Sequence, residues 1–268
     1  FYKHLKLMLA LTDKYASAVM NPPYMGSGNM NPQLSKYVKD HFEEGKADLF
    51  SVFMIQAIDL LTSKGKYGMI NMHSWMFLSS FENLRKTILK YQTIDNLLHL
   101  GPRTFDELSG EVVQNVAFVI TKKTPSTKGL YYRLVDGKNC TDKERIFLNA
   151  KSLDKIYYPN VSQHNFANIP GCPIGYWVSN KMIEHFINDP SLDKVADLRS
   201  GISTGDNDRF YRCWFECNIN KISPNHNYTP FNSNYRWFKI IRGGTFRKWY
   251  DCCDNVLNLE NSCYEIKN

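Results

Sequence analysis

An apolar strand that ends on two prolines is the feature that most constrains the fold of this chain. Residues 16–20 are small, apolar or β-branched in the pattern of a buried parallel strand. Asn21-Pro22-Pro23-Tyr24 follows directly, and the strand must end there because proline cannot continue a central strand. In an open α/β sheet, functional sites form at the carboxyl ends of the strands, so the sequence places the tetrapeptide at such a site.

Helical and strand patterns alternate over the residues that follow the tetrapeptide. The segment 47–62 repeats its apolar residues at helical spacing, and Lys64-Gly65-Lys66 is predicted to stop that helix. Strand–helix alternation predicts an α/β sheet with mostly parallel strands. The predicted elements are helices at 33–42, 47–62 and 81–89, and strands at 67–72, 94–100 and 112–121.

The pattern changes after Lys122, where a polar linker of residues 123–127 begins. Short strands are predicted near 130–135 and 145–148, the segment 157–173 is predicted to be irregular, and a further helix is predicted over 180–188. Beyond this helix the residues are aromatic, basic and rich in Asn. We therefore place a domain boundary between residues 125 and 170.

The composition limits the classes of protein to which this chain can belong. The chain has 268 residues, a formal net charge of +7 and a pI of about 8.9. This basic balance suits a polyanionic partner such as nucleic acid, although a soluble basic protein without one has the same balance. The 7 Cys form no CxxC pair, so the sequence predicts reduced cytosolic thiols and no metal site. No signal peptide or membrane-spanning run is visible, and we expect a cytoplasmic protein with no membrane partner.

The tetrapeptide suits the chemistry of an amine attached to an aromatic ring. Such an amine is a poor nucleophile because its lone pair is delocalised, and two acceptors that hold both N–H bonds draw the nitrogen toward tetrahedral geometry. The Asn21 side-chain oxygen is one such acceptor, and the Pro22 carbonyl, whose direction the prolines fix, is the second. Tyr24 offers a flat face for stacking on a base, which has to be flipped out of a duplex to reach it. The alternative is a Pro-Pro turn that only ends a strand.

Several segments resemble the amino-group DNA methyltransferases of the gamma order. They are residues 14–26, 48–53, 65–70, 100–105 and 116–120. Three later segments, 169–177, 201–207 and 242–250, resemble the methyltransferases of BREX phage-defence systems and fused type IIG restriction-modification enzymes. The resemblance covers nearly the whole chain. It implies methylation of adenine N6 in DNA, with duplex DNA and other phage-defence subunits as partners, in the bacterial cytoplasm.

The resemblance also implies a fold. We expect an α/β structure, the C-terminal half of a Rossmann-like methyltransferase sheet followed by a β-rich target-recognition domain. Residues 1–125 would form a partial catalytic domain without its cofactor-binding half. Residues 126–170 would form a linker with short strands, and residues 171–268 an incomplete target-recognition domain.

By position, the resemblance assigns roles to single residues. Phe105 matches an aromatic residue that packs on the flipped base from the other side, and a loop anchor is the equal alternative. Asp48 is assigned to the base pocket, and a helix N-cap is equally consistent with it. The implied catalytic residues are Asn21, Pro22, Pro23 and Tyr24.

S-adenosylmethionine is the implied cofactor, and in this order of motifs its glycine-rich loop precedes the catalytic motif. Gly26-Ser27-Gly28 is no substitute, because it follows the motif and does not join a strand to a helix. The chain begins at Phe1 within a helical pattern and without a cap, so we expect a piece of a longer protein with an exposed sheet edge. Alone, it should bind the cofactor weakly or not at all; micromolar binding by calorimetry would contradict this.

Basic and aromatic residues are interleaved between residues 199 and 250, where acidic residues are few. Lys and Arg neutralise phosphates, and the glycine pair at 243–244 lets a phosphate approach the backbone closely. The alternative is a β-rich aromatic core with solvated charges around it. The residues we expect to contact DNA are Arg209, Arg242, Gly243, Gly244, Arg247 and Lys248.

Two other functions remain open at this stage. Glutamine methyltransferases of protein-release factors use the same tetrapeptide, because a side-chain amide is also planar, but they normally end soon after the methyltransferase domain. A DNA-binding specificity fragment without catalysis is the second alternative. A glycine-rich strand-to-helix motif encoded upstream and in frame would favour the enzyme over this fragment.

Overall fold

The computed structural model describes residues 2–105, 113–125, 128–198, 201–224, 234–241, 248–249 and 254–267. These residues form two compact units, Phe1–Val195 and Ala196–Asn268. The first unit extends beyond residue 171, the predicted start of the target-recognition domain, because Cys172, Ile174 and Tyr176 pack into the core of the first unit. The assignment of functions to domains stays a prediction.

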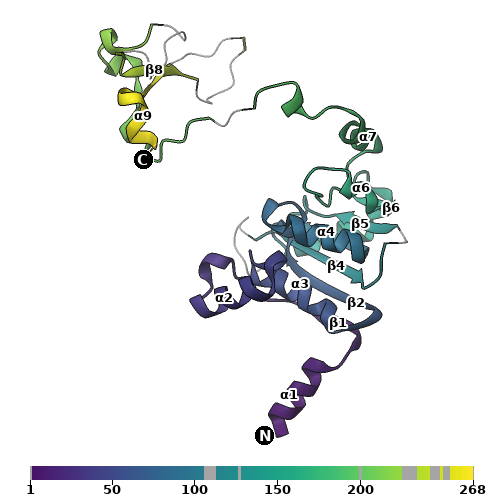
Figure 1. Ribbon diagram of the computed structural model, residues 1–268. Coiled ribbons are helices and arrows are strands. Elements are labelled where there is room, and N and C mark those ends of the chain that lie inside the picture. The colour runs from purple at the N-terminus through teal and green to yellow at the C-terminus, as the bar shows by residue number, and fades with distance from the viewer. Residues whose placement is uncertain are drawn as a thin grey trace. The chain divides into compact units, whose positions relative to one another are not determined.

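A six-stranded mixed sheet organises the first unit (Figure 1). β1 is parallel to β2 and β3 is parallel to β5, whereas β4 is antiparallel to both of its neighbours and β6 is antiparallel to β5. The prediction of mostly parallel strands is wrong, because β4 returns directly beside β3 and a direct return gives antiparallel neighbours. In spatial order the strands are β1 (Tyr15–Met20), β2 (Leu61–Met72), β4 (Asn115–Thr121), β3 (Thr93–Gly101), β5 (Gly129–Arg133) and β6 (Tyr157–Val161).

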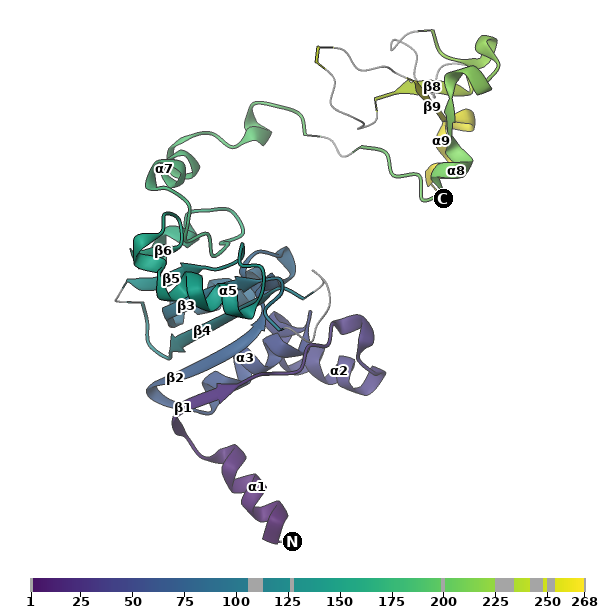
Figure 2. The ribbon, with the colours of Figure 1, turned by 180° about the vertical axis from the view of Figure 1, so that it is seen from behind.

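Helices α3 and α4 cover one face of the sheet, and the main core lies between them and the strands (Figure 1). Phe50 and Met54 of α3 and Ile88 of α4 are completely buried there. Figure 2 shows the strands from the opposite side. On the sheet, residues of β1, β2, β3 and β4 line a depression of about 520 Å³. The helices of this unit are α1 (Tyr2–Thr12), α2 (Pro32–His41), α3 (Leu49–Asp59), α4 (Glu82–Tyr91), α5 (Cys140–Leu148), α6 (His164–Ala167) and α7 (Asn180–Asn188).

β1 lies at one edge of the described sheet. Its prediction as a strand parallel to the next one is confirmed, but the prediction that it is buried is wrong, since Val19 is 85% exposed. Among the described residues β1 pairs only with β2, which leaves its other edge without a strand partner. The exposed edge that the sequence predicted is therefore present.

The junction between α3 and β2 also differs from the prediction. The helix ends at Asp59 and the strand already begins at Leu61, so Lys64-Gly65-Lys66 lies inside β2 instead of stopping a helix. Pairing between Tyr15 and Leu61 starts the strand early, and this contact joins residues far apart in the sequence.

Two more predictions fail between residues 140 and 173. The expected strand at 145–148 is the last turn of α5, whose N-cap Asn139 accepts a hydrogen bond from Asp142 N at 2.8 Å. The cap starts a helix that runs through the apolar residues at its end. The segment expected to be irregular contains strand β6 and the short helix α6.

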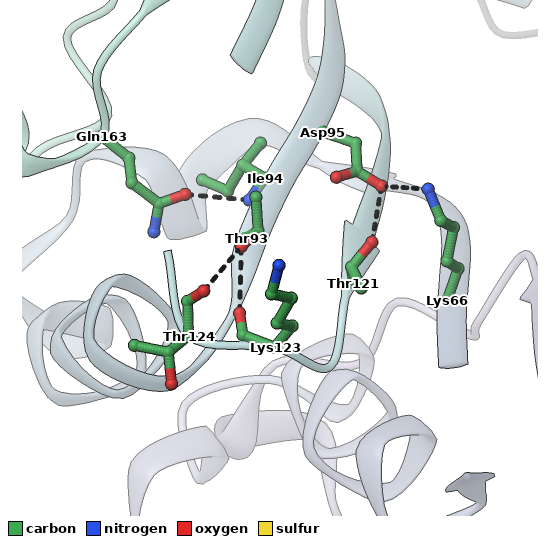
Figure 3. Close-up of polar contacts among 8 residues, drawn as sticks. All are labelled: Lys66, Thr93, Ile94, Asp95, Thr121, Lys123, Thr124 and Gln163. Atoms are coloured by element: carbon green, nitrogen blue, oxygen red, sulfur yellow. Dashed lines mark hydrogen bonds and ion pairs between the residues drawn. The ribbon is translucent and has the colours of Figure 1, made fainter. Parts of the chain in front are cut away.

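Polar contacts fasten β3 at the end of the sheet away from the tetrapeptide (Figure 3). Gln163 Oε1 accepts a hydrogen bond from Ile94 N at 2.9 Å, and its Nε2 donates to Gln92 O at 2.8 Å. Asp95 Oδ2 accepts from Thr121 Oγ1 at 2.6 Å and pairs with Lys66 Nζ at 2.8 Å. These contacts connect β3 to β2, to β4 and to the segment that leads into α6.

The second unit has a three-stranded antiparallel sheet in the order β7-β9-β8. Its small core contains Phe210, Phe238, Leu257 and Leu259, so two of the interleaved aromatics are core residues. This sheet agrees with the β-rich fold expected for the C-terminal part. The elements are α8 (Asn207–Phe210), β7 (Tyr211–Cys213), β8 (Trp237–Ile240), β9 (Asn255–Asn258) and α9 (Glu260–Lys267).

Candidate active site

Tyr24 is held by both the sheet and helix α3. Its hydroxyl accepts a hydrogen bond from Asn115 Nδ2 at 3.1 Å and donates to the Ile70 carbonyl at 3.4 Å. Its ring packs edge-on against Phe50, with centroids 6.3 Å apart and an interplanar angle of 86°. Burial raises the pKa of the hydroxyl, as does the charge of Asp48, while the hydrogen bond from Asn115 lowers it. The net shift is upward, so the side chain stays neutral at pH 7.

Asp48 fastens the loop after the tetrapeptide to the start of α3. Its Oδ1 accepts hydrogen bonds from Met25 N at 3.0 Å and from Phe50 N at 3.2 Å, the second as the N-cap of the helix. Leu49 N in turn donates to Met25 O at 3.0 Å. The N-cap interpretation of Asp48 is confirmed, and its contact with a base stays a prediction.

The two proposed amine acceptors lie at the carboxyl end of β1. Asn21 is exposed and Pro22 is buried, with Pro23 exposed beside it. In the described part of the chain, neither the Asn21 side chain nor the Pro22 carbonyl has a hydrogen-bond partner. Both acceptors are therefore unpaired within the described residues, next to a tyrosine ring whose hydroxyl is already held.

Buried polar atoms without partners lie next to Tyr24. Among the described residues these include Asn115 Oδ1 and both polar side-chain atoms of Asn71, although Asn115 Nδ2 also approaches the Asn71 carbonyl at 3.4 Å. The two residues are 1% and 0% exposed, respectively. Buried polar groups without partners are rare and call for a functional explanation or a bound water. These unpaired atoms mark the end of β2 and the start of β4 as a candidate functional site.

Neither Asn71 nor Asn115 was predicted as a site residue from the sequence. The sequence nevertheless contains a signal for both residues. Asn71 interrupts the apolar strand pattern Met69–Met72, and Asn115 directly precedes the apolar run Val116–Ile120. Only the antiparallel pairing of β2 with β4, in which Met72 faces Asn115, brings the two residues together beside Tyr24.

Phe105 is half-buried and lies four residues beyond the end of β3. The turn before it contains Gly101, whose φ of +68° suits glycine, and Thr104 Oγ1 donates to the Gly101 carbonyl at 3.0 Å. Residues 106–112 lie outside the described part of the chain. The stacking role of Phe105 stays a prediction.

The expected DNA-binding residues lie in the second unit. Arg209 is exposed, and its Nη2 pairs with Glu265 Oε2 at 2.8 Å while its guanidinium lies over the Phe210 ring. Lys248 is exposed, and the adjacent Trp249 is 91% exposed. The other four predicted residues, Arg242, Gly243, Gly244 and Arg247, lie outside the described residues.

The described residues contain no candidate membrane span and no candidate metal site. None of the described helices has the length and apolar character needed to cross a membrane. Within the same residues, no group of three or more His, Cys, Asp and Glu side chains is placed to bind a metal ion.

Comparison with known proteins identifies close relatives. The family model described as Eco57I restriction-modification methylase matches residues 3–105. The chain is 41% identical over 255 residues to the adenine-specific methyltransferase PglX of Lacticaseibacillus casei (strain Zhang), covering 94% of this chain and 21% of that protein. It is 39% identical over 258 residues to the adenine-specific methyltransferase BrxX of Escherichia coli O9:H4 (strain HS), covering 96% of this chain and 20% of that protein.

The chain thus spans about one fifth of the length of these curated relatives. Among solved structures, it is similar to the type I restriction-modification methyltransferase subunit from Streptococcus thermophilus. That similarity has 17% sequence identity and a TM-score of 0.44, over 61% of this chain and 38% of that one.

Proposed function

Because the chain belongs to the family of adenine-specific methyltransferases that includes PglX and BrxX, we propose that the full-length protein methylates N6 of an adenine flipped out of duplex DNA. The observation that carries this proposal is the fixed Tyr24 ring beside two acceptors at the carboxyl end of β1 that are unpaired among the described residues. Duplex DNA is the substrate class, and other phage-defence subunits are the expected partners.

The chain's own residues act on the acceptor base. Tyr24 stacks on the flipped adenine, and its position is set before the base arrives, which limits the entropy lost on binding. Asn21 Oδ1 and the Pro22 carbonyl accept the two N–H bonds of the exocyclic amine. These contacts favour the tetrahedral nitrogen that forms as its lone pair attacks, so they are stronger in the transition state than in the ground state.

S-adenosylmethionine supplies the electrophilic methyl group in this family. Among the described residues, the glycines that follow the tetrapeptide do not fit the main binding site of the cofactor. Gly26 forms an isolated bridge with Asp48, and Gly28 lies in a 3-10 turn, Ser27–Asn29, so neither joins a strand to a helix. We therefore assign only the acceptor side of the reaction to this chain, and we expect weak cofactor binding or none by the chain alone.

Expression of the full-length gene in a methylation-deficient host tests the function. N6-methyladenine would be mapped across the genomic DNA, with the Asn21→Ala variant as the control. Methylation at one sequence motif that disappears in Asn21→Ala would establish the enzyme, its base and its target. Duplex binding without methylation by the unaltered protein would instead support a DNA-binding specificity module.

Asn115→Leu is expected to lower the methylation rate about 10-fold, because Asn115 positions the Tyr24 hydroxyl. The substitution removes the bond from Nδ2, and it also removes an unpaired buried oxygen, so stability should change little. The measurement is a double-mutant cycle on single-turnover methylation with Tyr24→Phe, which lacks the hydroxyl. An equal loss in the Tyr24→Phe background would contradict this role.

Reversing two charges of the second unit, Arg247→Glu with Lys248→Glu, is expected to weaken DNA binding at least about 10-fold. If each residue contacts one phosphate, the slope of log Kd against log salt concentration should fall by about 2. The matched control reverses two exposed lysines of the first unit, Lys90→Glu with Lys151→Glu. Equal salt slopes for the two double variants would contradict the prediction that Arg247 and Lys248 contact DNA phosphates.

A further inference from the structure

A cavity of about 720 Å³ opens at the carboxyl edge of the sheet, next to the candidate active site. We call it the histidine pocket. His73 N donates to Gln114 O at 2.8 Å, and Gln114 immediately precedes the residue that holds Tyr24. The volume falls within the roughly 300–1,000 Å³ of small-molecule sites. Its lining includes His73, Phe77, His99, Arg133, Lys155 and Trp177, but neither Asn21 nor Tyr24.

One wall of the histidine pocket is a stack of aromatic rings. Trp177 is 42% exposed and is backed by His99, with ring centroids 6.2 Å apart and an interplanar angle of 26°. Phe77 supports the same indole at 5.7 Å. A partly exposed indole held by two other rings is a preformed platform for a flat ligand, and any nucleobase has such a face.

The pocket also has positive charge. Arg133 lies at the end of β5, where it pairs with Asp136, and Lys155 is exposed. The two basic side chains come from different segments and line the cavity that Trp177 also lines. A cation pair next to a stacking surface matches a base together with its phosphate, because the phosphate is bound by Lys and Arg.

A chain of hydrogen bonds leads from the pocket wall into the core. His73 Nδ1 lies 2.8 Å from His99 Nε2, and His99 Nδ1 lies 3.1 Å from the Tyr176 hydroxyl. Burial, assisted by the nearby His73, lowers the pKa of His99 to about 3, and burial also lowers the pKa of His73. Both rings are therefore neutral at pH 7. A neutral imidazole donates from one nitrogen and accepts at the other. If every hydrogen bond in this series reverses its direction, His73 Nε2 therefore changes from a donor into an acceptor.

From these features we propose that the histidine pocket binds a second nucleotide of the DNA substrate, separate from the base held at Asn21 and Tyr24. Its base stacks on Trp177, its phosphate lies at Lys155 and Arg133, and His73 meets the base edge as donor or acceptor. The proposal rests on the proposed function for the identity of the substrate. A free nucleotide has the same chemistry and is the competing source.

An abasic-site scan tests the proposal on the full-length protein. Duplexes containing the methylated motif would carry one abasic nucleotide at each position around the target adenine. For the unaltered protein, an abasic nucleotide at one flanking position should weaken equilibrium binding about 5- to 150-fold, the range expected for loss of one stacked base. In Trp177→Ala that penalty should disappear. The same penalty profile in both proteins would overturn the proposal.

A second variant keeps the test decisive if Trp177→Ala does not fold. Lys155→Gln changes an exposed side chain and should lower the salt slope of DNA binding by about 1, while the matched control Lys151→Gln leaves it unchanged. Equal slopes for the two variants would count against a phosphate at Lys155.

Two further measurements distinguish failure of the pocket proposal from failure of the proposed function. Titration with deoxyadenosine monophosphate, followed by calorimetry, tests the free nucleotide. Saturable binding that Trp177→Ala abolishes, with no dependence on abasic position, would overturn the DNA assignment. Methylation is measured separately with Asn21→Ala. Absence of methylation by the unaltered protein would defeat the proposed function, whereas the effect of Trp177→Ala on DNA binding is read independently of methylation.

Discussion

Replacing Asn21 with alanine is expected to lower the single-turnover rate of adenine methylation by the full-length protein about 100- to 1,000-fold or more. Loss of one preorganised polar contact to charge that develops in a transition state typically has an effect of this size. The Asn21 side chain is exposed and has no hydrogen-bond partner in the described part of the chain, so its removal should leave the fold intact. DNA affinity should stay within about 3-fold, because most of that affinity comes from phosphate contacts.

The control for Asn21→Ala is Asn29→Ala, which removes the same side chain from an exposed position in the loop after the tetrapeptide. This variant should methylate at the rate of the unaltered protein. A rapid-quench assay with saturating cofactor measures the chemical step for all three proteins. Equal rates for Asn21→Ala and Asn29→Ala would show that the Asn21 side chain does not hold the amine.

Replacing Arg85 with alanine is expected to lower the free energy of unfolding of the first unit by about 3–5 kcal/mol. Arg85 is 1% exposed, and its guanidinium donates four hydrogen bonds to three main-chain carbonyls. Without it, these carbonyls lose a buried donor, and each loss costs about 1–3 kcal/mol. The acceptors are Trp75 O at 2.8 Å, Leu78 O at 2.7 Å and Gly171 O at 3.1 and 2.7 Å.

Lys86→Ala is the matched control, one residue further along α4. Lys86 Nζ pairs with Glu82 Oε1 at 2.7 Å on the surface, with a lysine side chain that is 54% exposed. Its loss should change the free energy of unfolding by no more than about 0.5 kcal/mol. Urea unfolding of the chain measures both variants. Arg85→Lys should be intermediate, because an ammonium group lacks the fixed fork that reaches three carbonyls. Equal midpoints for Arg85→Ala and Lys86→Ala would refute this account.

The Arg85 contacts also explain why the Ile169–Trp177 segment belongs to the first unit. Gly171 O receives two hydrogen bonds from Arg85, and Ile174 N donates to Met76 O at 2.9 Å. These bonds hold the segment against α4 and carry Trp177 to the wall of the histidine pocket. Sequence similarity alone grouped this segment with the recognition domain, because composition does not reveal which core a short apolar segment joins.

The sequence by itself determined the local structure of this protein, meaning where strands end and where helices begin. Asn21-Pro22-Pro23-Tyr24 ends a strand because proline cannot continue one, and Asn31, Asp48 and Ser179 accept hydrogen bonds as N-caps at the starts of predicted helices. Tertiary structure decided what depends on distant partners. It placed β4 between β2 and β3, extended β2 back to Leu61 and left Val19 exposed. It also brought Asn115 to Tyr24, and His73 to His99, across strands that are separated in the sequence. Turns and caps depend on neighbouring residues, whereas these pairings depend on the register of a sheet that no local pattern specifies.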